Sequence, residues 1–377
     1  MPPIAPANPL AIYAITKHGL AIAERIQRAF PAAHIYASPR VAPQASAPVL
    51  PLQLPMGPTL ASTFKAYECH VHIISVGAVV RMISPLLEDK KHDPAVVCVD
   101  DAGTFVICVL SGHVGYGNHH TRQIAAAIHA TPVITTASDV TGTLTVDILG
   151  RELGWSLDHP EQRVTEACAA VVNQAPVAFV QETGEPNFWP LDQPLPPGVR
   201  YFRDLKDVQP HAFTMLLVVS DRDLLRTQPE HAARAVIYRP KSLVLGLGCD
   251  SQTPAALLDR GISYHCEQAG LDRRCIRNLA TIDLKQHEPG ILALCERYGW
   301  HLETYPAHVL DAVTGIETPS SVVQRHVGTR TVAEAACLKS AGSARLLLPK
   351  QRYRESEHGR SMTMALARIP FLARSTN

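Results

Sequence analysis

The sequence predicts an α/β protein made of three units, and three observations lead to this prediction. Short apolar runs of strand length alternate with segments whose apolar residues recur at helical spacing. The chain has 377 residues, 46% of them hydrophobic, which is enough for two or three domains. Proline-rich stretches without periodicity at 38–58 and 185–198 indicate loops. We therefore expect an N-terminal α/β domain at 9–153, a variable middle domain at 154–240 and a C-terminal α/β domain at 241–372.

The N-terminal domain is predicted to be a Rossmann-like sheet with parallel strands inside, because its strands alternate with helices. It opens with an apolar run at 10–15, which Thr16-Lys-His-Gly19 separates from a helical pattern at 21–26. Asp100-Asp-Ala-Gly103 lies between two strands and predicts a hairpin, since Gly103 can adopt a positive φ. The expected strands are 34–37, 71–76, 95–99, 104–110 and 132–135, and the expected helices are 79–83, 121–129 and 143–152.

The middle and C-terminal domains show a similar alternation. Thr331-Val-Ala-Glu334 reads as a capping box at the start of a C-terminal helix. In the middle domain a helix is expected at about 161–173, with strands at 177–180, 215–219 and 235–238. In the C-terminal domain we expect strands at 242–249, 301–305, 346–350 and 362–366, and helices beginning near 253, 288 and 331.

The composition excludes several classes of protein. A formal net charge of +1 argues against a dedicated nucleic-acid binder. The longest apolar runs, such as 105–110, are far shorter than the about 20 residues that a membrane-spanning helix needs. The N-terminus has no basic residue before its first apolar stretch, so it does not resemble a secretory signal. Nine cysteines without a C-x-x-C pair fit reduced thiols and exclude cysteine-based zinc sites. We expect a cytoplasmic protein.

The most informative segment is Leu110-Ser-Gly-His-Val-Gly-Tyr-Gly-Asn118, which leaves a strand and enters a helix. Glycine-rich loops at helix N-termini expose backbone amides that favour anions. The glycine spacing is not that of a dinucleotide-binding or phosphate-binding loop, which disfavours a nucleotide-dependent enzyme. A tight turn that needs small residues would explain the glycines equally well. His113 favours a functional site, because an imidazole can act as an acid or base near neutral pH.

Two neighbouring segments could join this loop. Lys90-Lys-His-Asp-Pro94 places opposite charges together before a strand, although a solvated turn is the simpler explanation. Thr135-Thr-Ala-Ser-Asp139 supplies hydroxyls and a carboxylate at a strand end, and a helix cap would explain it equally well. Asp147 lies in the predicted helix at 143–152, where a carboxylate is more often a surface residue than a base.

The C-terminal domain offers weaker candidates. Gly246-Leu-Gly-Cys249 is a glycine turn after a strand, and Glu288 is expected at a helix start, where a carboxylate suits the helix dipole. Lys285 follows a strand, and Lys350 follows Leu-Leu-Leu-Pro, although an exposed lysine would explain the latter. Glu334 is read as the capping-box acid. The sequence has no G-x-S-x-G nucleophile motif and no H-E-x-x-H zinc motif.

Together these motifs resemble those of the cobalt-precorrin-5A hydrolase family of oxygen-independent cobalamin biosynthesis. The N-terminal resemblance rests on Ser75-Val-Gly-Ala-Val-Val-Arg81, Lys90, Asp93-Pro-Ala-Val-Val, Asp100, Leu110-Ser-Gly-His-Val-Gly115, Asn118, and Val133-Ile-Thr-Thr136 with Asp139. The C-terminal resemblance rests on Gly246-Leu-Gly-Cys249, Leu279 to Lys285, Glu288-Pro-Gly290, Val327-Gly-Thr, Val332-Ala-Glu-Ala-Ala336 and Leu348-Pro-Lys350. That domain also resembles the stand-alone CobE-type domain of the aerobic pathway. The two blocks stand in the family's order and, with the middle domain, cover nearly the whole chain.

The resemblance implies a hydrolase acting on carbon–carbon bonds. A δ-lactone of cobalt-precorrin-5A is hydrolysed, and a two-carbon fragment leaves as acetaldehyde, which gives cobalt-precorrin-5B. The first stage needs an activated water and an oxyanion stabiliser. The second stage is a retro-aldol-like cleavage that needs a base at the departing hydroxyl and an electron sink. The corrinoid ring and its cobalt can be that sink, so no protein-bound cofactor or metal is expected.

On this reading His113 is the general base, the Gly115–Asn118 amides bind an oxyanion or carboxylate, and Asp100 or Asp139 orients the imidazole. The substrate carries many carboxylates, for which Arg81, Lys90 and Lys285 are the expected anchors. The remaining expected substrate contacts are Asp93, Ser111, Gly112, Gly115, Asn118, Thr135, Thr136, Glu288 and Lys350.

The sequence departs from the family at two places. The family usually reads Gly-His-Leu-Gly-Gly-Ala-Asn, whereas here Tyr116 and Gly117 precede Asn118. Asp250 and Ser251 also replace the basic pair that often follows the cysteine at position 249. An alternative function is a non-catalytic carrier of corrinoid intermediates in the same pathway, which would bind the substrate but release no acetaldehyde. A homodimer and transient contacts with pathway methyltransferases are left open.

Overall fold

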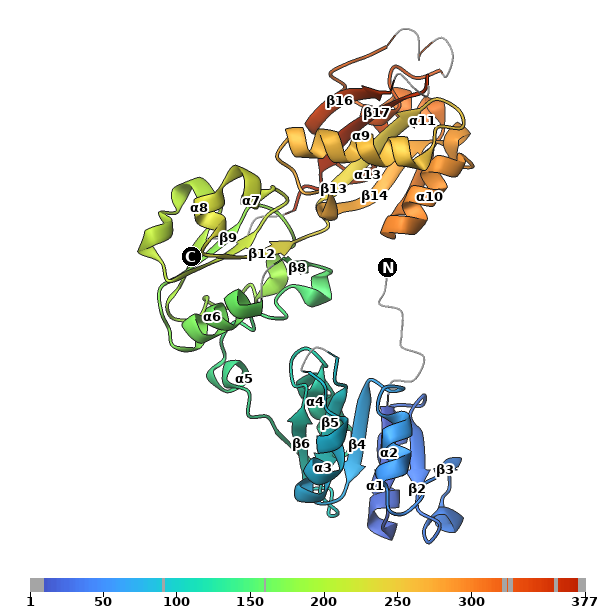
Figure 1. Cartoon of the computed structure of the whole chain (residues 1–377), viewed down its shortest axis with the longest axis vertical. Helices are drawn as coiled ribbons and strands as arrows, with labels where there is room; N and C mark the ends of the chain where they lie inside the picture. The colour runs from blue at the N-terminus through green and yellow to red at the C-terminus, as the bar shows by residue number, and fades with distance from the viewer. Residues whose placement is uncertain are drawn as a thin grey trace. The chain divides into compact units, whose positions relative to one another are not determined.

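The computed structural model describes residues 10–89, 92–158, 161–320, 324, 328–355 and 359–371. The chain forms two compact units that divide between Ile148 and Leu149, and each is described by itself (Figure 1). Both contain helices and parallel strands, so the predicted α/β class is confirmed. In the part of the chain that the structure describes, we find no helix that is both long and apolar enough to cross a membrane.

The first unit is built on a seven-stranded sheet with the order β3-β2-β1-β4-β5-β6-β7. The pairs from β3 through β5 are parallel, which confirms the predicted parallel interior. The strands are β1 (Leu10–Ala14), β2 (His34–Ala37), β3 (Val49–Pro51), β4 (Cys69–Ile73), β5 (Ala95–Val99), β6 (Phe105–Leu110) and β7 (Thr131–Val133). The helices are α1 (Lys17–Ala29), α2 (Gly57–Thr63), α3 (Val76–Ile83), α4 (Gly117–Ala127) and α5 (Ala137–Thr141).

Helices cover both faces of this sheet, which explains why its central strands are apolar throughout. Successive side chains of a strand point to opposite faces, and all five residues of β1 are buried. Leu10 and Ile12 pack in the core beneath α1 and α4, whereas Ala11 and Tyr13 pack in the core beneath α2 and α3. A continuous apolar run is therefore required here, as in other doubly covered sheets.

The direction of β6 decides where the candidate loop lies. The predicted hairpin is confirmed, because β6 pairs antiparallel with β5 and places Leu110 opposite Val96. The last strand, β7, runs parallel to β6. The carboxyl ends of β6 and β7 therefore lie at the edge of the sheet where β1 to β5 begin. The loop around His113 is at this edge, and Asp100 is at the opposite one.

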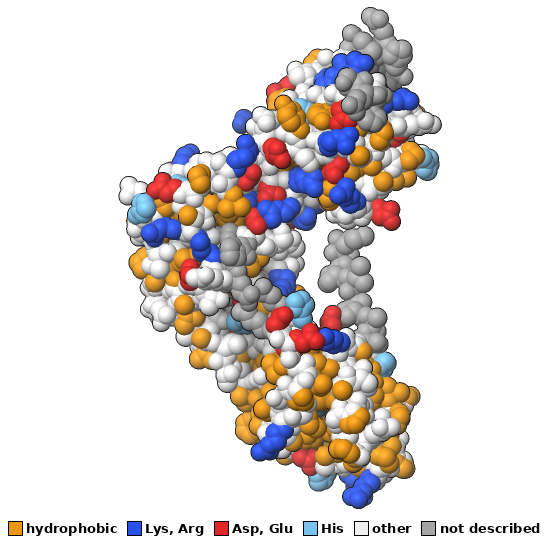
Figure 2. Space-filling model, viewed as in Figure 1, with side chains coloured by type: hydrophobic (Ala, Val, Ile, Leu, Met, Phe, Trp, Pro, Cys, Tyr) orange, Lys and Arg blue, Asp and Glu red, His pale blue; other side chains and the backbone are white. Residues whose placement is uncertain are grey.

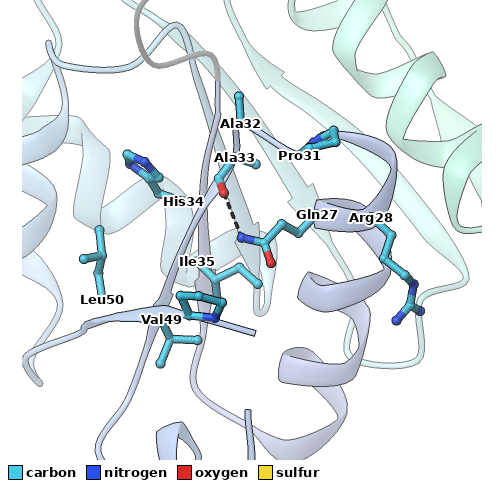
Figure 3. Close-up of a pocket in the computed structure, with 10 residues that line it drawn as sticks. Gln27, Arg28, Pro31, Ala32, Ala33, His34, Ile35, Val49 and Leu50 are labelled. Atoms are coloured by element: carbon cyan, nitrogen blue, oxygen red, sulfur yellow. Dashed lines mark hydrogen bonds between the residues drawn. The ribbon is translucent and has the colours of Figure 1, made fainter. Parts of the chain in front are cut away.

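A cavity of about 660 Å³ lies at the amino ends of β2 and β3, and Figure 3 shows the residues that line it. It is lined by apolar side chains together with Arg28 and His34, and Gln27 closes one side by donating to the carbonyl of Ala33 at 2.9 Å. In the sheet order, β2 is separated from β6 by β1, β4 and β5, which is roughly 19 Å at about 4.8 Å per strand. The cavity is therefore not part of the His113 loop.

The second unit contains two five-stranded sheets, with orders β10-β9-β11-β12-β8 and β15-β14-β13-β17-β16. In the first of them, β8 is the antiparallel edge strand, and in the second β16 and β17 are antiparallel. The strands of the first sheet are β8 (Ser156–Asp158), β9 (Val177–Gln181), β10 (Val199–Phe202), β11 (Met215–Val219) and β12 (Ala235–Arg239). The helices between them in the chain are α6 (Glu161–Val172), α7 (Leu224–Thr227) and α8 (Pro229–Ala232).

The second of these sheets carries the remaining elements. They are β13 (Leu243–Cys249), α9 (Ala255–Gln268), β14 (Ile276–Ile282), α10 (Pro289–Tyr298), β15 (His301–Tyr305), α11 (Ala307–Asp311), α13 (Ala333–Ala341), β16 (Leu346–Arg354) and β17 (Ser361–Arg368). Its apolar core lies between β13, β14, α9 and α10 on one face, and beneath α13 on the other. On the surface drawn in Figure 2, described Lys and Arg side chains are interspersed with Asp and Glu.

Buried ion pairs join the two sheets of the second unit. The guanidinium of Arg239 is only 1% exposed and contacts carboxylates of Asp158 and Asp272, each at 3.2 Å. Asp221, which follows β11, accepts two hydrogen bonds from Arg368 of β17 at 2.6 and 2.7 Å. These pairs link residues far apart in sequence, so they fix the two sheets to each other.

Candidate functional site

The imidazole of His113 lies between two carboxylates of the first unit. Its Nε2 is 3.0 Å from Asp139 Oδ2, and its Nδ1 is 3.4 Å from Asp147 Oδ2. The hydroxyl of Ser138 also lies 3.1 Å from Nε2. His113 comes from the loop between β6 and α4, Asp139 from α5, and Asp147 from the turn that follows α5. All three side chains are partly buried and remain accessible from solvent.

This arrangement favours the protonated form of His113. A neutral imidazole has one N–H donor, whereas an imidazolium has two and can serve both carboxylates. The hydrogen bond with Asp147 raises the pKa of His113 above its ordinary value, burial acts in the opposite direction, and Asp139 adds to the increase. The geometry therefore does not favour the predicted role of His113 as a base in the resting protein, because a base must begin unprotonated.

Asp139 is held as an anion by a set of donors. Although burial alone would raise its pKa, hydrogen bonds from Arg122, Thr136 and His113 lower the pKa of Asp139 to about 2. Thr136 Oγ1 and Asn118 Nδ2 each donate to Asp139 Oδ2 at 2.8 Å, and Arg122 contacts the other oxygen. A carboxylate with so many donors is a poor proton acceptor, and it lies within hydrogen-bonding distance of the imidazole.

The loop itself is shaped by close packing. A Cβ at Gly115 would lie 2.6 Å from Ser111 Cβ, and a Cβ at Gly117 would lie 2.8 Å from the carbonyl oxygen of Leu110. Ser111 and Tyr116 both adopt positive φ, at 53° and 62°. The packing explanation for these two glycines is therefore correct, whatever else the loop does.

The predicted anion cradle is wrong for three of its four amides. The amide of Tyr116 donates to His113 O at 3.0 Å, that of Gly117 to Ser111 O at 3.0 Å, and that of Asn118 to Gly112 O at 2.9 Å. The loop curls back so that its own carbonyls accept these hydrogens, which leaves none of the three to bind an oxyanion. The polar groups that remain at the site belong to side chains.

Several predicted residues support this loop or lie elsewhere. Ser111 Oγ donates to the carbonyl of Asp93 at 2.8 Å, and the Asp93 carboxylate accepts from the amide of Glu88 at 3.0 Å. Asp100 accepts from the amides of Thr104 and Phe105 at 2.8 and 2.6 Å. It therefore caps the hairpin turn at the opposite edge of the sheet, and its predicted role in orienting His113 is wrong.

The other N-terminal candidates are placed as follows. Gly112 packs against the side chain of Asn118, whose Oδ1 a Cβ would approach at 2.8 Å. Thr135 is exposed and immediately precedes Thr136, shortly after β7. Arg81 is exposed in the last turn of α3. Lys90 lies outside the described residues.

The C-terminal candidates belong to the second unit and form two clusters there. Lys285 Nζ lies 3.1 Å from Glu288 Oε2, and Glu288 precedes α10, as predicted. Lys350 is elsewhere, with Nζ on the carbonyl of Thr318 and its amide 2.9 Å from Glu334 Oε1. Glu334 is not a capping-box acid, because its oxygens accept from Glu317, Thr318 and Lys350 rather than from the start of its own helix.

Three residues that touch this site were not among the predicted site residues, although the sequence analysis discussed Asp147 and the segment that contains Ser138. Asp147 was placed on a helix at 143–152, whereas the chain forms turns there, with Gly150 at a φ of 71°. Arg122 stands four residues after Asn118, on the same face of α4, and that spacing could have identified it. Ser138 is one residue from Asp139 and is largely buried.

Three family models match consecutive parts of the chain. They are described as Cobalamin synthesis G N-terminal over residues 58–139, Cobalamin biosynthesis central region over 144–240, and Cobalamin synthesis G C-terminus over 243–367. His113 and Asp139 fall within the first match. Asp147 falls within the second.

Curated relatives match most of the chain. Cobalt-precorrin-5A hydrolase of Priestia megaterium is 37% identical over 375 residues, which covers 98% of this chain and 97% of the relative. Cobalt-precorrin-5A hydrolase of Salmonella typhimurium is 30% identical, over 88% of this chain and 92% of the relative. Protein CobE of Sinorhizobium sp is 35% identical over 111 residues, which is 28% of this chain and 70% of that protein.

Proposed function

Because the chain belongs to the cobalamin synthesis G family, we propose that it hydrolyses the δ-lactone of cobalt-precorrin-5A and releases acetaldehyde. The product is cobalt-precorrin-5B, and the reaction is a step of anaerobic cobalamin biosynthesis. The observation that carries the assignment of roles is the His113 imidazole, flanked by Asp139 and Asp147 within the matched segments. An imidazolium held by two carboxylates suits a reaction that must move a proton onto and off one oxygen atom.

In the first stage, water adds to the lactone carbonyl, one of the water's two protons passes to solvent, and the ring C–O bond breaks. The departing alkoxide oxygen takes the proton of His113, so the products are a carboxyl group and a hydroxyl group. Protonating the leaving oxygen lowers the barrier to ring opening, because an alkoxide is a poor leaving group. His113 leaves this stage neutral and keeps one N–H, which can still donate to one of the two carboxylates.

In the second stage, neutral His113 takes the proton back from the same hydroxyl. The carbon–carbon bond to the macrocycle then breaks, acetaldehyde forms, and the electron pair moves into the corrinoid ring, which is later protonated. The cobalt belongs to the substrate, and we propose that the enzyme needs no cofactor of its own. One group can therefore act first as an acid and then as a base, and it ends the cycle as it began.

The carboxylates of the substrate need cationic partners. The guanidinium of Arg122 is bound to Asp139, and its side chain is about half exposed. We propose that it contacts a substrate carboxylate through its outward N–H groups, since guanidinium groups bind carboxylates well. Arg81, Lys285 and Lys350 remain proposed anchors. A cytoplasmic location, a homodimer and contacts with methyltransferases also remain proposals.

The test is acetaldehyde release from cobalt-precorrin-5A by the whole protein and by His113→Ala. We expect the variant to lose at least about 100-fold in kcat, since positioned acid–base groups contribute about 10²- to 10⁴-fold. His129→Ala is the matched control, because His129 is exposed and follows α4, the helix that comes directly after the His113 loop. Wild-type release from the His113 variant would remove His113 from the mechanism. Binding of the substrate by the wild-type protein without any acetaldehyde would favour the carrier alternative.

A further inference from the structure

The loop that carries His113 also presents an aromatic ring to solvent. We propose that the exposed ring of Tyr116, which His119 holds edge to face, forms a flat ledge on which the face of the corrinoid macrocycle stacks, which makes Tyr116 a specificity-determining residue. This inference rests on the proposed function, because the ligand is the substrate named there. Three features of the described residues support it: the backbone of Tyr116, the packing of its neighbours, and the position of its ring.

The backbone of Tyr116 is one that glycine adopts more easily. Its φ is 62° and its ψ is 16°, in the left-handed region. A residue with a side chain is disfavoured there, because its Cβ comes close to the following carbonyl oxygen. An aromatic residue in such a position stores strain, and strain of this kind often accompanies a functional role. The fold alone would be better served by glycine.

The neighbouring positions could not carry this ring. Gly115 and Gly117 are closely packed, since an added Cβ would lie within 2.8 Å of loop atoms at either residue. Tyr116 is the residue between them whose side chain leaves the loop. Its amide donates to the carbonyl of His113 at 3.0 Å, so the two residues belong to one turn. The ring at 116 is therefore carried by the same turn as the His113 imidazole.

The ring is placed to receive a flat ligand. The Tyr116 side chain is 39% exposed, which is high for a large aromatic residue. The ring of His119, also exposed, meets it edge to face with centroids 6.4 Å apart. Such a pair fixes the orientation of the Tyr116 ring. Conjugated ligands gain affinity by stacking on exposed aromatic faces, and a corrinoid is a large conjugated ring.

The experiment compares steady-state kinetics for cobalt-precorrin-5A and thermal unfolding of Tyr116→Gly and Tyr116→Phe with those of the whole wild-type protein. We expect Tyr116→Gly to raise KM about tenfold, in line with the loss of one stacked aromatic partner, while its Tm stays the same or increases. Tyr116→Phe keeps the ring and is expected to recover the KM lost in the glycine variant. A wild-type KM in Tyr116→Gly would overturn the proposal, and so would an equal loss in the phenylalanine variant.

His129→Gly is the matched control for strain. His129 is also exposed and has a positive φ of 51°, so its replacement relieves a similar backbone without touching the loop. We expect its KM to be that of the wild-type protein. If Tyr116→Gly lowers the Tm, Tyr116→Asn replaces it, since asparagine tolerates this conformation.

These experiments also distinguish a failure of the ledge proposal from a failure of the proposed hydrolase function. If the wild-type protein binds cobalt-precorrin-5A and releases no acetaldehyde, the hydrolase proposal fails. In that case the ledge proposal is tested by the Kd of each variant for cobalt-precorrin-5A, measured by equilibrium dialysis. A tenfold weaker Kd in Tyr116→Gly would support it, and an unchanged Kd would overturn it.

Discussion

Replacing Asp147 by asparagine should shift the pH dependence of catalysis, because it removes one of the two charges beside His113. The two charged atoms are 3.4 Å apart. At the dielectric constant of water, unit charges at that distance attract by about 1 kcal/mol, and at an effective value of ~20 by about 5 kcal/mol. Both side chains are partly solvated, so the lower figure is the safer guide. Since 1.36 kcal/mol corresponds to about one pKa unit, the pKa of His113 should fall by about one unit or more.

The direction of the effect on rate follows from the protonated state. Ring opening needs the imidazolium, so kcat/KM should decline as the pH rises through the pKa of His113 in the free enzyme. In Asp147→Asn this alkaline limb should move to lower pH by about one unit. The assay is acetaldehyde release from cobalt-precorrin-5A between pH 5 and pH 9, with an alcohol dehydrogenase and NADH reporting the aldehyde.

The control must change the net charge equally without touching the site. Asp192→Asn serves this purpose, because Asp192 is exposed in a loop of the second unit. We expect its profile to match that of the wild-type protein. An alkaline limb that stays in place in Asp147→Asn, or that moves to higher pH, would refute the assignment of Asp147 as the partner that keeps His113 protonated.

Two further predictions concern stability. Burial lowers the pKa of His70 to about 4 and that of His72 to about 3. Below about pH 6.5 the unfolded chain therefore takes up protons that the folded chain does not, and stability falls by as much as about 1.4 kcal/mol per pH unit for each histidine. Urea unfolding at pH 7, 6 and 5 measures the free energy of unfolding, and an equal value at all three pH values would contradict this prediction. Asp221→Ala leaves Arg368 without its buried partner and should destabilise the second unit by about 3 kcal/mol. An unchanged denaturant midpoint would show that the pair contributes little.

Predictions of structure from the sequence were most accurate where the structure depends on residues that are adjacent in the chain. The hairpin at Asp100–Gly103 was predicted from its turn residues and is present. The same hairpin makes β6 antiparallel to β5, so the end of β5 and the end of β6 lie at opposite edges of the sheet. Asp100 follows the first of these ends and His113 follows the second, so the predicted contact between them was wrong.

Strand direction also explains why the structure brings some of the predicted site residues together and not others. Asp139 could be associated with His113 because both follow neighbouring parallel strands, β6 and β7, whose carboxyl ends meet. Asp147 could not, because its contact depends on turns that have no periodicity and on the left-handed conformation of Gly150. The loop amides were predicted to face a ligand from their glycines alone, whereas the fold of the loop turns three of them inward.

The central claim is that Asp147 and Asp139 raise the pKa of His113 and so favour its imidazolium form. NMR titration of histidine-labelled protein, with the His113 signal assigned by its loss in His113→Ala, measures this directly. The account predicts a pKa for His113 above the ordinary value of about 6.5, because Asp147 and Asp139 both stabilise the imidazolium. A pKa at or below that value would show that the two carboxylates do not hold the proton, and the acid-then-base role of His113 would be contradicted.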